Sequence, residues 1–207
     1  MKKVRLTAAL GLVLLLGGCK IAGNGFDPQE NTIYVSEDRT LSTATVEACS
    51  PETYSADELR TFVEQAVSDY NEEKIGQAKA VNEEGQEKLP VAVRSCEIEE
   101  GQAVMILDYA SSEDLVNFGT EAGIPITGLT VSDVSEATGI EQSLKKAGSG
   151  EKVSADAVAA SEGTLVQTDG PAVVQTDGKI LYVTDGAEVT GDRTVRMPEG
   201  GGAVIFE

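Results

Sequence analysis

Residues 91–109, VAVRSCEIEEGQAVMILDY, indicate the fold of this chain more directly than any other stretch. Two runs rich in apolar residues, 91–98 and 103–109, flank the polar segment Glu99-Glu100-Gly101-Gln102, a pattern that predicts a β-hairpin. Residues 103–107 are apolar on both faces, so they are expected to form a central strand that is buried on both sides. A sheet built on this hairpin is therefore the first expectation for the fold.

A long amphipathic helix is predicted on the N-terminal side of this hairpin. Ser55-Ala56-Asp57-Glu58 has the form of a capping box, in which serine and glutamate satisfy backbone amides at a helix start. Behind it, apolar residues recur at intervals of three and four, a stripe that should lie across a sheet. These residues are Leu59, Phe62, Val63, Ala66, Val67 and Tyr70. The pattern predicts a helix over about residues 56–73.

Shorter elements are expected on both sides of these two. Residues 32–46 contain two β-branched stretches around a polar turn, which predicts a first hairpin. Residues 111–114 offer caps for a short helix that continues to Phe118. Further short helices are expected at 139–147 and 154–160, and a last strand at 203–206.

The motif Thr-Asp-Gly occurs three times near the C-terminus, beginning at Thr168, Thr176 and Thr184. Asp-Gly supplies the positive φ angles of tight hairpin turns, so the regular spacing predicts a β-meander. The alternative is a cation-binding ladder, although known calcium-binding repeats have another period and more glycines. Its ligands would be Asp169, Asp177 and Asp185.

Together these patterns predict an α+β fold. It would consist of a mainly antiparallel sheet, one long amphipathic helix at about 56–73 and a β-rich C-terminal meander. Residues 32–207 are expected to form one domain. The alternative division is a domain at 32–118 followed by a β-rich part at 164–207.

Composition excludes several classes of chemistry. The 207 residues include 35 Asp+Glu, 16 Lys+Arg and no His. Without histidine there is no Ser-His-Asp or Cys-His triad and no imidazole ligand for a metal. The formal charge of −19 repels nucleic acid, so nucleic acid is not expected as a partner. Such a charge fits either a solvated surface or recruitment of a cation or a basic partner.

The first residues have the pattern of an export signal. A basic start with Lys2, Lys3 and Arg5 precedes the apolar run 6–16, whose 11 residues are about half the ~20 that span a bilayer as a helix. The run ends in Leu16-Gly17-Gly18-Cys19, which resembles the lipobox of the bacterial lipoprotein family.

This resemblance implies that residues 1–18 are a cleaved signal peptide and that Cys19 carries a diacylglyceryl group. The mature chain would then contact membrane lipid through the acylated Cys19 and sit on the extracytoplasmic face of the cell membrane. Residues 19–31 would be a flexible spacer, since they are rich in Gly, Asn, Asp and Gln. Removing three basic and no acidic residues leaves 13 Lys+Arg against 35 Asp+Glu, a formal charge of −22.

The two remaining cysteines, Cys49 and Cys96, have two interpretations. An exported domain permits a disulfide between them, which would stabilise the fold by about 4 kcal/mol in the chain-entropy model. The alternative is two thiols packed separately as small apolar groups. The sequence does not decide between these.

Catalytic motifs are weak. Ser143-Leu144-Lys145-Lys146 matches the Ser-x-x-Lys pattern of penicillin-binding enzymes, but the accompanying motifs are missing. Adjacent glutamates such as Glu83-Glu84 could serve a glycosidase, yet the chain has no Trp to line a glycan site. No phosphate loop, dinucleotide fingerprint or metal-binding motif is present, so no metal, cofactor or enzyme activity is expected.

The order of elements from Ile33 to Phe118 adds a second resemblance. Ile33-Tyr34-Val35-Ser36, the helical stretch 59–70 and the hairpin 93–112 are similar in order to the spore-germination GerM-type domain. That resemblance implies a small envelope domain without catalysis.

The expected function is a lipid-anchored binding or assembly module with an envelope protein or cell wall as partner. The alternatives are a ligand-binding lipoprotein associated with a transporter and a cell-wall hydrolase.

Overall fold

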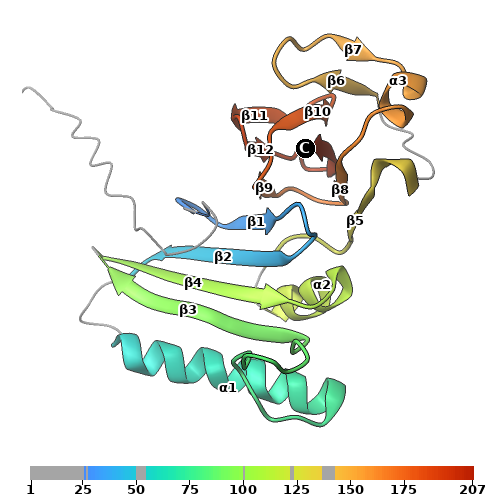
Figure 1. Cartoon of the computed structure of the whole chain (residues 1–207). Coiled ribbons are helices and arrows are strands. Elements are labelled where there is room, and N and C mark those ends of the chain that lie inside the picture. Colours follow the sequence, from blue (N-terminus) through green and yellow to red (C-terminus); the bar gives the residue numbers. More distant parts are fainter. Residues whose placement is uncertain (1–25, 27, 50–54, 100, 122–123, 137–142) are drawn as a thin grey trace, which may run out of the picture.

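The computed structural model describes residue 26 and residues 28–49, 55–99, 101–121, 124–136 and 143–207. Within these residues the chain forms one sheet of seven strands and one of six, together with three α-helices. The predicted α+β fold with a single long helix is wrong, because the core is organised by two β-sheets and the helices are additions to them. Figure 1 shows α1 beneath β3 and the C-terminal strands gathered at the other end of the molecule.

The two predicted hairpins of the first half are confirmed. β1 (Thr32–Val35) pairs with β2 (Leu41–Ala48), and β3 (Val91–Glu99) pairs with β4 (Gln102–Tyr109), all antiparallel. β4 also pairs with β2, so it is an interior strand of the seven-stranded sheet, whose order is β11-β12-β9-β1-β2-β4-β3. Its neighbouring side chains at 106 and 107 face opposite sides of the sheet and are both buried, as expected for a central strand.

The helix α1 (Ala56–Ile75) begins at the predicted capping box. The Ser55 hydroxyl accepts from the Glu58 amide, the Glu58 carboxylate accepts from the Ser55 amide, and Gly76 ends the helix with φ 70°. The predicted apolar stripe is too wide, because Phe62 is 73% exposed. Residues 63, 67 and 71 form the buried line at intervals of four, and position 62 lies about 100° around the helix from that line.

Asn71 was not anticipated as a buried residue of α1. It is fully buried, and its amide donates to the carbonyl oxygens of Lys79 and Val91 at 2.7 Å each. Its side-chain oxygen accepts from the Val91 amide at 3.1 Å. The Asn71 side chain thus satisfies both the backbone amide and the backbone carbonyl of Val91, the first residue of the edge strand β3. It thereby joins α1 to β3.

The helix α2 (Ser112–Glu121) is confirmed where the caps predicted it. The Ser111 hydroxyl accepts from the Asp114 amide at 3.1 Å and donates to its carboxylate. Tyr70 of α1 donates to the same carboxylate at 3.2 Å and packs edge-on against Phe118. These contacts fix the two helices to each other at one end of the sheet.

The middle of the chain belongs to the second sheet. It contains β5 (Leu129–Asp133), a 3-10 turn (Val134–Glu136), β6 (Leu144–Lys146), β7 (Lys152–Val153) and α3 (Ala155–Ala159). The short helix α3, capped by Ser154, is confirmed. A helix at 139–147 is wrong for its described residues, because Leu144–Lys146 pair with β10 and tertiary pairing overrides local preference. Residues 139–142 of that prediction lie outside the described residues.

Six strands make up the C-terminal part: β8 (Thr164–Thr168), β9 (Val173–Thr176), β10 (Ile180–Thr184), β11 (Glu188–Gly191), β12 (Thr194–Arg196) and β13 (Gly202–Phe206). The predicted meander is wrong. β8, β10 and β13 lie in the six-stranded sheet, of order β5-β8-β13-β10-β6-β7, whereas β9, β11 and β12 lie in the seven-stranded one. The chain therefore crosses between sheets after β8, β9, β10 and β12, and β11–β12 is the hairpin within this part.

The Thr-Asp-Gly motifs lie at these crossings. The buried Thr168 hydroxyl donates to the Gly170 carbonyl at 3.1 Å, and the buried Thr176 hydroxyl repeats this with Gly178 at 2.8 Å. The hydroxyl satisfies a backbone carbonyl that no strand neighbour reaches at the corner. The repeat thus marks places where the chain changes sheet.

One large core joins the two halves of the chain. It contains Val67 of α1, Leu107 of β4, Val174 of β9 and Phe206 of β13, and the parallel pairing of β1 with β9 makes one continuous sheet. Residues 32–118 and 164–207 consequently share both a sheet and a core. A smaller cluster on the other face of the first sheet contains Phe26, stacked on Tyr34 at 4.7 Å.

Candidate binding groove

The seven-stranded sheet has a gap beside β2. β1 lies between β2 and β9 and pairs with both, but it begins at Thr32, opposite Ala44. Residues 45–48 of β2 therefore have no strand of the described chain beside them on that side. Because β1 holds its two neighbours two strand spacings apart, roughly 10 Å, the sheet beyond Thr32 contains a gap about one strand wide.

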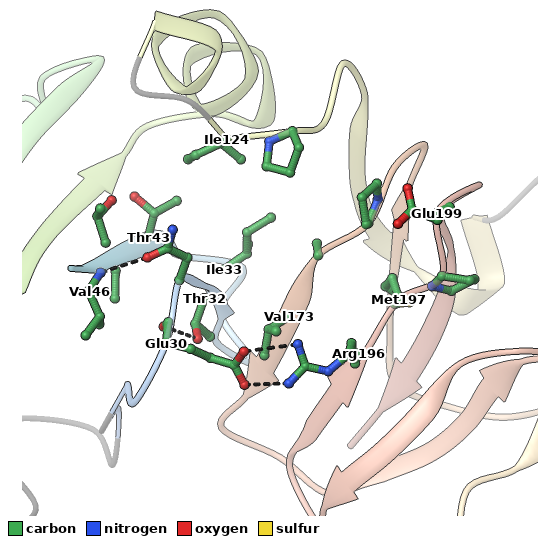
Figure 2. A pocket seen from close by; sticks show the side chains of 17 residues that line it. Glu30, Thr32, Ile33, Thr43, Val46, Ile124, Val173, Arg196, Met197 and Glu199 are labelled. Carbon is green, nitrogen blue, oxygen red and sulfur yellow. Dashed lines mark hydrogen bonds and ion pairs between the residues drawn. The ribbon is translucent and has the colours of Figure 1, made fainter. Parts of the chain in front are cut away.

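A groove of about 880 Å³ lies at this gap (Figure 2). Residues 43–46 of β2 form one wall, and Pro171, Ala172 and Val173 at the start of β9 form the other. Ile124, from the segment between α2 and β5, lies over it in Figure 2, and Pro125 of the same segment also lines it. Clefts of roughly 300–1,000 Å³ with mainly apolar walls commonly bind ligands, and this groove falls within that range.

An ion pair spans one end of the groove. The guanidinium of Arg196 donates to both carboxylate oxygens of Glu30, at 2.7 and 3.0 Å, and this contact raises the pKa of Arg196. Both side chains are about half exposed, 48% and 49%, so the pair contributes little to stability. The pair links the segment before β1 to β12 at this end of the groove.

A second link closes part of the gap from the side of β2. The side-chain oxygen of Asn31 accepts from the backbone amide of Val46 at 2.8 Å. This amide points toward the gap and would otherwise be available to a neighbouring strand. The charged residues of the groove are Glu30, Glu199 and Arg196, and because Glu30 and Arg196 neutralise each other, Glu199 leaves it a net negative charge.

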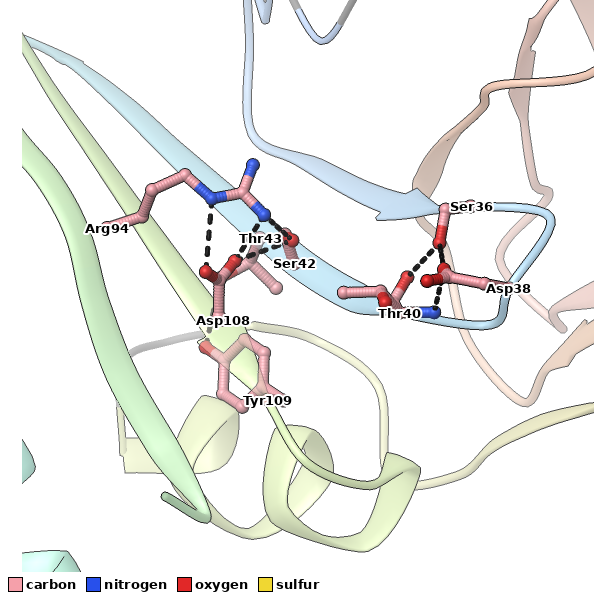
Figure 3. A network of polar contacts seen from close by, with 8 residues as sticks. All are labelled: Ser36, Asp38, Thr40, Ser42, Thr43, Arg94, Asp108 and Tyr109. Atoms are coloured by element: carbon pink, nitrogen blue, oxygen red, sulfur yellow. Dashed lines mark hydrogen bonds and ion pairs between the residues drawn. The ribbon is translucent and has the colours of Figure 1, made fainter. Parts of the chain in front are cut away.

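A polar cluster on β2, β3 and β4 is a candidate reactive site (Figure 3). Ser42, fully buried, donates to the Asp108 carboxylate at 2.8 Å and accepts from Arg94 at 2.8 Å. Arg94 also donates to Asp108, at 3.1 Å. The Ser42 hydroxyl thus donates to a carboxylate that is already paired with arginine. These bonds link β2, β3 and β4, and they do not supply the free base that would activate Ser42 as a nucleophile.

The β1–β2 turn beside this cluster is closed by Asp38. Its carboxylate accepts from the Ser36 hydroxyl and, at 3.1 Å, from the Thr40 amide, which lowers its pKa to about 2. Arg39 adopts φ 64° in the same turn.

On the other face of β2, the Thr43 hydroxyl and the Tyr109 hydroxyl share a buried hydrogen bond of 2.9 Å, and burial raises the pKa of Tyr109.

The predicted lipidation site, Cys19, lies outside the described residues, as do the signal peptide at 1–18 and most of the spacer at 19–31. Lipidation therefore stays a prediction. Among the helices of the described chain, none combines the length and apolar character needed to cross a membrane.

Cys49 and Cys96 are described, and they are not bonded to each other. Cys96 pairs with Met105, which pairs with Thr45, while the Cys49 amide donates to the Gly101 carbonyl. Cys49 is therefore four residues along β2 from the position level with Cys96, roughly 13 Å, whereas disulfides need Cα atoms within about 7 Å. This geometry supports the interpretation of two separate thiols, and burial raises the pKa of Cys96.

The three aspartates of the Thr-Asp-Gly motifs are directed to different loops. Asp169 accepts from the Thr127 amide at 2.9 Å, Asp185 lies 3.9 Å from Lys145, and burial raises the pKa of Asp177. They do not form a ladder. No group of three or more Cys, Asp or Glu residues in the described parts of the chain could hold a metal ion.

The Ser-x-x-Lys motif lies at the start of a strand. Lys145 and Lys146 belong to β6, where side chains three residues apart point to opposite faces, so Ser143 and Lys146 do not share a face as they would on a helix. Lys146 pairs with Glu151 at 2.7 Å.

The groove itself was missed by sequence reasoning. Its ion pair joins residues 30 and 196, and its walls come from β2 and β9, which are more than a hundred residues apart. No local pattern signals such a site. Comparisons with protein-family models, curated proteins and solved structures find no match, so the resemblances to the lipoprotein and GerM-type families stay predictions.

Proposed function

We propose that this chain is a lipoprotein anchored through Cys19 on the extracytoplasmic face of a membrane, where it acts as a non-enzymatic binding or assembly module. The observation that carries this proposal is the segment Leu16-Gly17-Gly18-Cys19 directly after a basic start and an apolar run. Two acyl chains on one cysteine are the usual requirement for stable anchoring.

The start of the described fold is consistent with such an anchor. Phe26 is the first described residue and packs on Tyr34, so few residues separate Cys19 from the folded part. Glu30 lies eleven positions after Cys19, and even a fully extended chain of that length spans at most about 40 Å. The groove, which begins at Glu30, would therefore operate close to the membrane surface.

The binding role is supported by the groove, and the non-enzymatic role by the lack of histidine in the chain. The buried serine of the β-sheet cluster, Ser42, is held between arginine and a carboxylate and not beside a free base. A ligand-binding lipoprotein that serves a transporter is the second candidate, because the groove volume also fits a small solute.

The anchor is tested by metabolic labelling with a fatty-acid analogue in cells that export the chain. The unaltered protein should incorporate the label and sediment with membranes, and Cys19→Ala should abolish both. Cys49→Ala is the matched control and should retain both. Label that persists in Cys19→Ala, or an unlabelled native chain, would contradict the proposal.

A further inference from the structure

We propose that the groove between β2 and β9 binds an extended, basic segment of a partner protein, which pairs with the edge of β2 as an added strand. This proposal names the partner for the binding role above and rests on that role. Four features of the groove lead to it: its width, its backbone groups, its apolar walls and its charge.

The width of the gap selects an extended chain. β2 and β9 are held two strand spacings apart by β1, so the space beyond Thr32 accepts one strand. A helix with side chains is about 10–12 Å across and does not fit between them. Peptides that add a strand to a sheet edge are a recurring mode of recognition.

The backbone of β2 directs hydrogen-bonding groups into the gap. Thr40 presents its carbonyl to β1 and Val46 presents its amide to Asn31, whereas the Cys49 amide faces β4. Backbone direction alternates along a strand, so Val46 and Ala48 both face the gap. The Val46 amide already donates to the Asn31 side-chain oxygen, which occupies the place where a carbonyl oxygen of an incoming strand would accept. An added strand would therefore displace Asn31 from Val46 or pair with Ala48.

The wall formed by residues 171–173 is suited to van der Waals contact without backbone hydrogen bonds. Pro171 has no amide to donate, so an inserted chain would hydrogen-bond to β2 and pack against β9. Alternate side chains of that chain would enter the space beneath Ile124, between Ile33 and Val173. These walls favour aliphatic side chains at every second position.

Charge selects a basic partner. Glu199 is exposed at the far end of the groove, Glu30 and Arg196 neutralise each other at the near end, and the whole chain carries −19. Arg196 is already held by Glu30. A segment with lysine or arginine between its aliphatic residues would be attracted, while an acidic segment would be repelled.

The first test uses acetyl-Val-Lys-Val-Lys-Val-Lys-amide as the probe and the matched Val-Glu peptide as the control. Each is titrated into the full-length chain and followed by the amide resonances of Val46 and Ala48. The expected result is saturable binding of the lysine peptide, slower hydrogen exchange at Ala48, and affinity for the glutamate peptide weaker by roughly tenfold or more. Binding of neither peptide, or equal binding of both, would overturn the proposal.

Two pairs of variants locate the site. Ala48→Pro removes one amide that faces the gap and should weaken binding roughly tenfold, while Ala48→Val keeps that amide and should not. Glu199→Lys should weaken binding of the lysine peptide, while Glu73→Lys, an equal charge change on the exposed end of α1, should have a much smaller effect. Equal effects within either pair would overturn the assignment to this groove.

The Glu199 and Glu73 variants change exposed side chains, so they stay informative if Ala48→Pro fails to fold. Cys19→Ala should bind the lysine peptide as tightly as the unaltered chain, so loss of peptide binding and loss of anchoring are distinguishable. Displacement of the peptide by a second copy of the chain, or binding of phosphatidylglycerol vesicles in place of the peptide at the same amides, would contradict a basic protein segment as the occupant.

Discussion

The two halves of the molecule build β-structure in different ways. In the first half, strands next to each other in the sequence pair as hairpins, β1 with β2 and β3 with β4. In the C-terminal part, from β8 to β13, consecutive strands mostly separate: β8 pairs with β5 and β13, and β9 pairs with β1 and β12. Strands that are consecutive in the sequence are therefore neighbours in the sheet in the first half, and mostly are not in the C-terminal part.

This difference shows what a turn motif determines. Asp-Gly bends the chain after β8, β9 and β10, but the sheet that receives the next strand depends on what lies beside the corner. Asp169 is held by Thr127 ahead of β5, and the Asp177 amide donates to Val35 at the end of β1. The corners of the C-terminal part are thus set by residues distant in sequence, and mutations there should differ from those in the hairpin half.

The largest effect is expected for Gly201→Ala before β13. Gly201 has φ 72°, and a Cβ there would overlap the Thr168 carbonyl and lie 2.6 Å from the Asp169 carbonyl carbon. Backbone strain and overpacking together should lower the free energy of unfolding by about 3–4 kcal/mol in urea denaturation. Gly200→Ala is the control, since nothing lies within 4 Å of its Cβ position, and equal losses in both variants would refute the close packing of this corner.

A smaller but substantial loss is expected for Asn71→Ala in the hairpin half. The substitution leaves the amide and carbonyl of Val91 and the carbonyl of Lys79 without the Asn71 side chain. Burying these groups unpaired should cost about 2–3 kcal/mol by urea denaturation. Gln65→Ala on the exposed face of the same helix should cost under about 0.5 kcal/mol, and a similar cost at both sites would argue against this link.

An intermediate effect is expected for Thr176→Val at a crossing corner. The shape is nearly retained, but the bond from the Thr176 hydroxyl to the Gly178 carbonyl is lost in a buried site. We expect a loss of about 1–2 kcal/mol by thermal or urea unfolding. Thr190→Val, on the exposed β11–β12 hairpin, should be close to neutral, and neutrality of both would show that the hydroxyl does not hold the corner.

The smallest effect concerns pH and the β1–β2 turn. Hydrogen bonds from Ser36 and Thr40 lower the pKa of Asp38 from 3.8 to about 2, so its contribution is present above pH 4 and is lost as the pH falls toward 2. The stability difference between the unaltered chain and Asp38→Asn should therefore shrink over that interval. A difference that stays constant from pH 5 to about pH 2 would show that the ionised carboxylate does not stabilise the turn.

Local sequence patterns predicted what local contacts decide. The capping box at Ser55, the polar turns of both hairpins and the Ser154 cap involve partners within a few residues, and the structure confirms them. The exposed Phe62 shows the limit of periodicity, because the width of a buried stripe depends on how the helix meets the sheet.

The groove depends on contacts that no local pattern contains. The pairing of β1 with β9 joins residues 33–35 to 174–176, and the gap arises because β1 begins only at Thr32, opposite Ala44, while β2 continues to Ala48. The predicted fold class was wrong for the same reason. Tertiary contacts, and not local sequence, assign β8, β9 and β10 to alternate sheets. The lipobox lies outside the described residues, so the anchor stays a sequence prediction.

The pairing between β1 and β9 is the contact on which the groove and the comparison of the two halves both depend. Nuclear Overhauser contacts measured in solution between the backbones of residues 33–35 and 174–176 test it most directly. We expect parallel-strand contacts that include Ile33 with Val174, and no contacts of a hairpin between β9 and β10. Antiparallel contacts between residues 173–176 and 180–184 would contradict it.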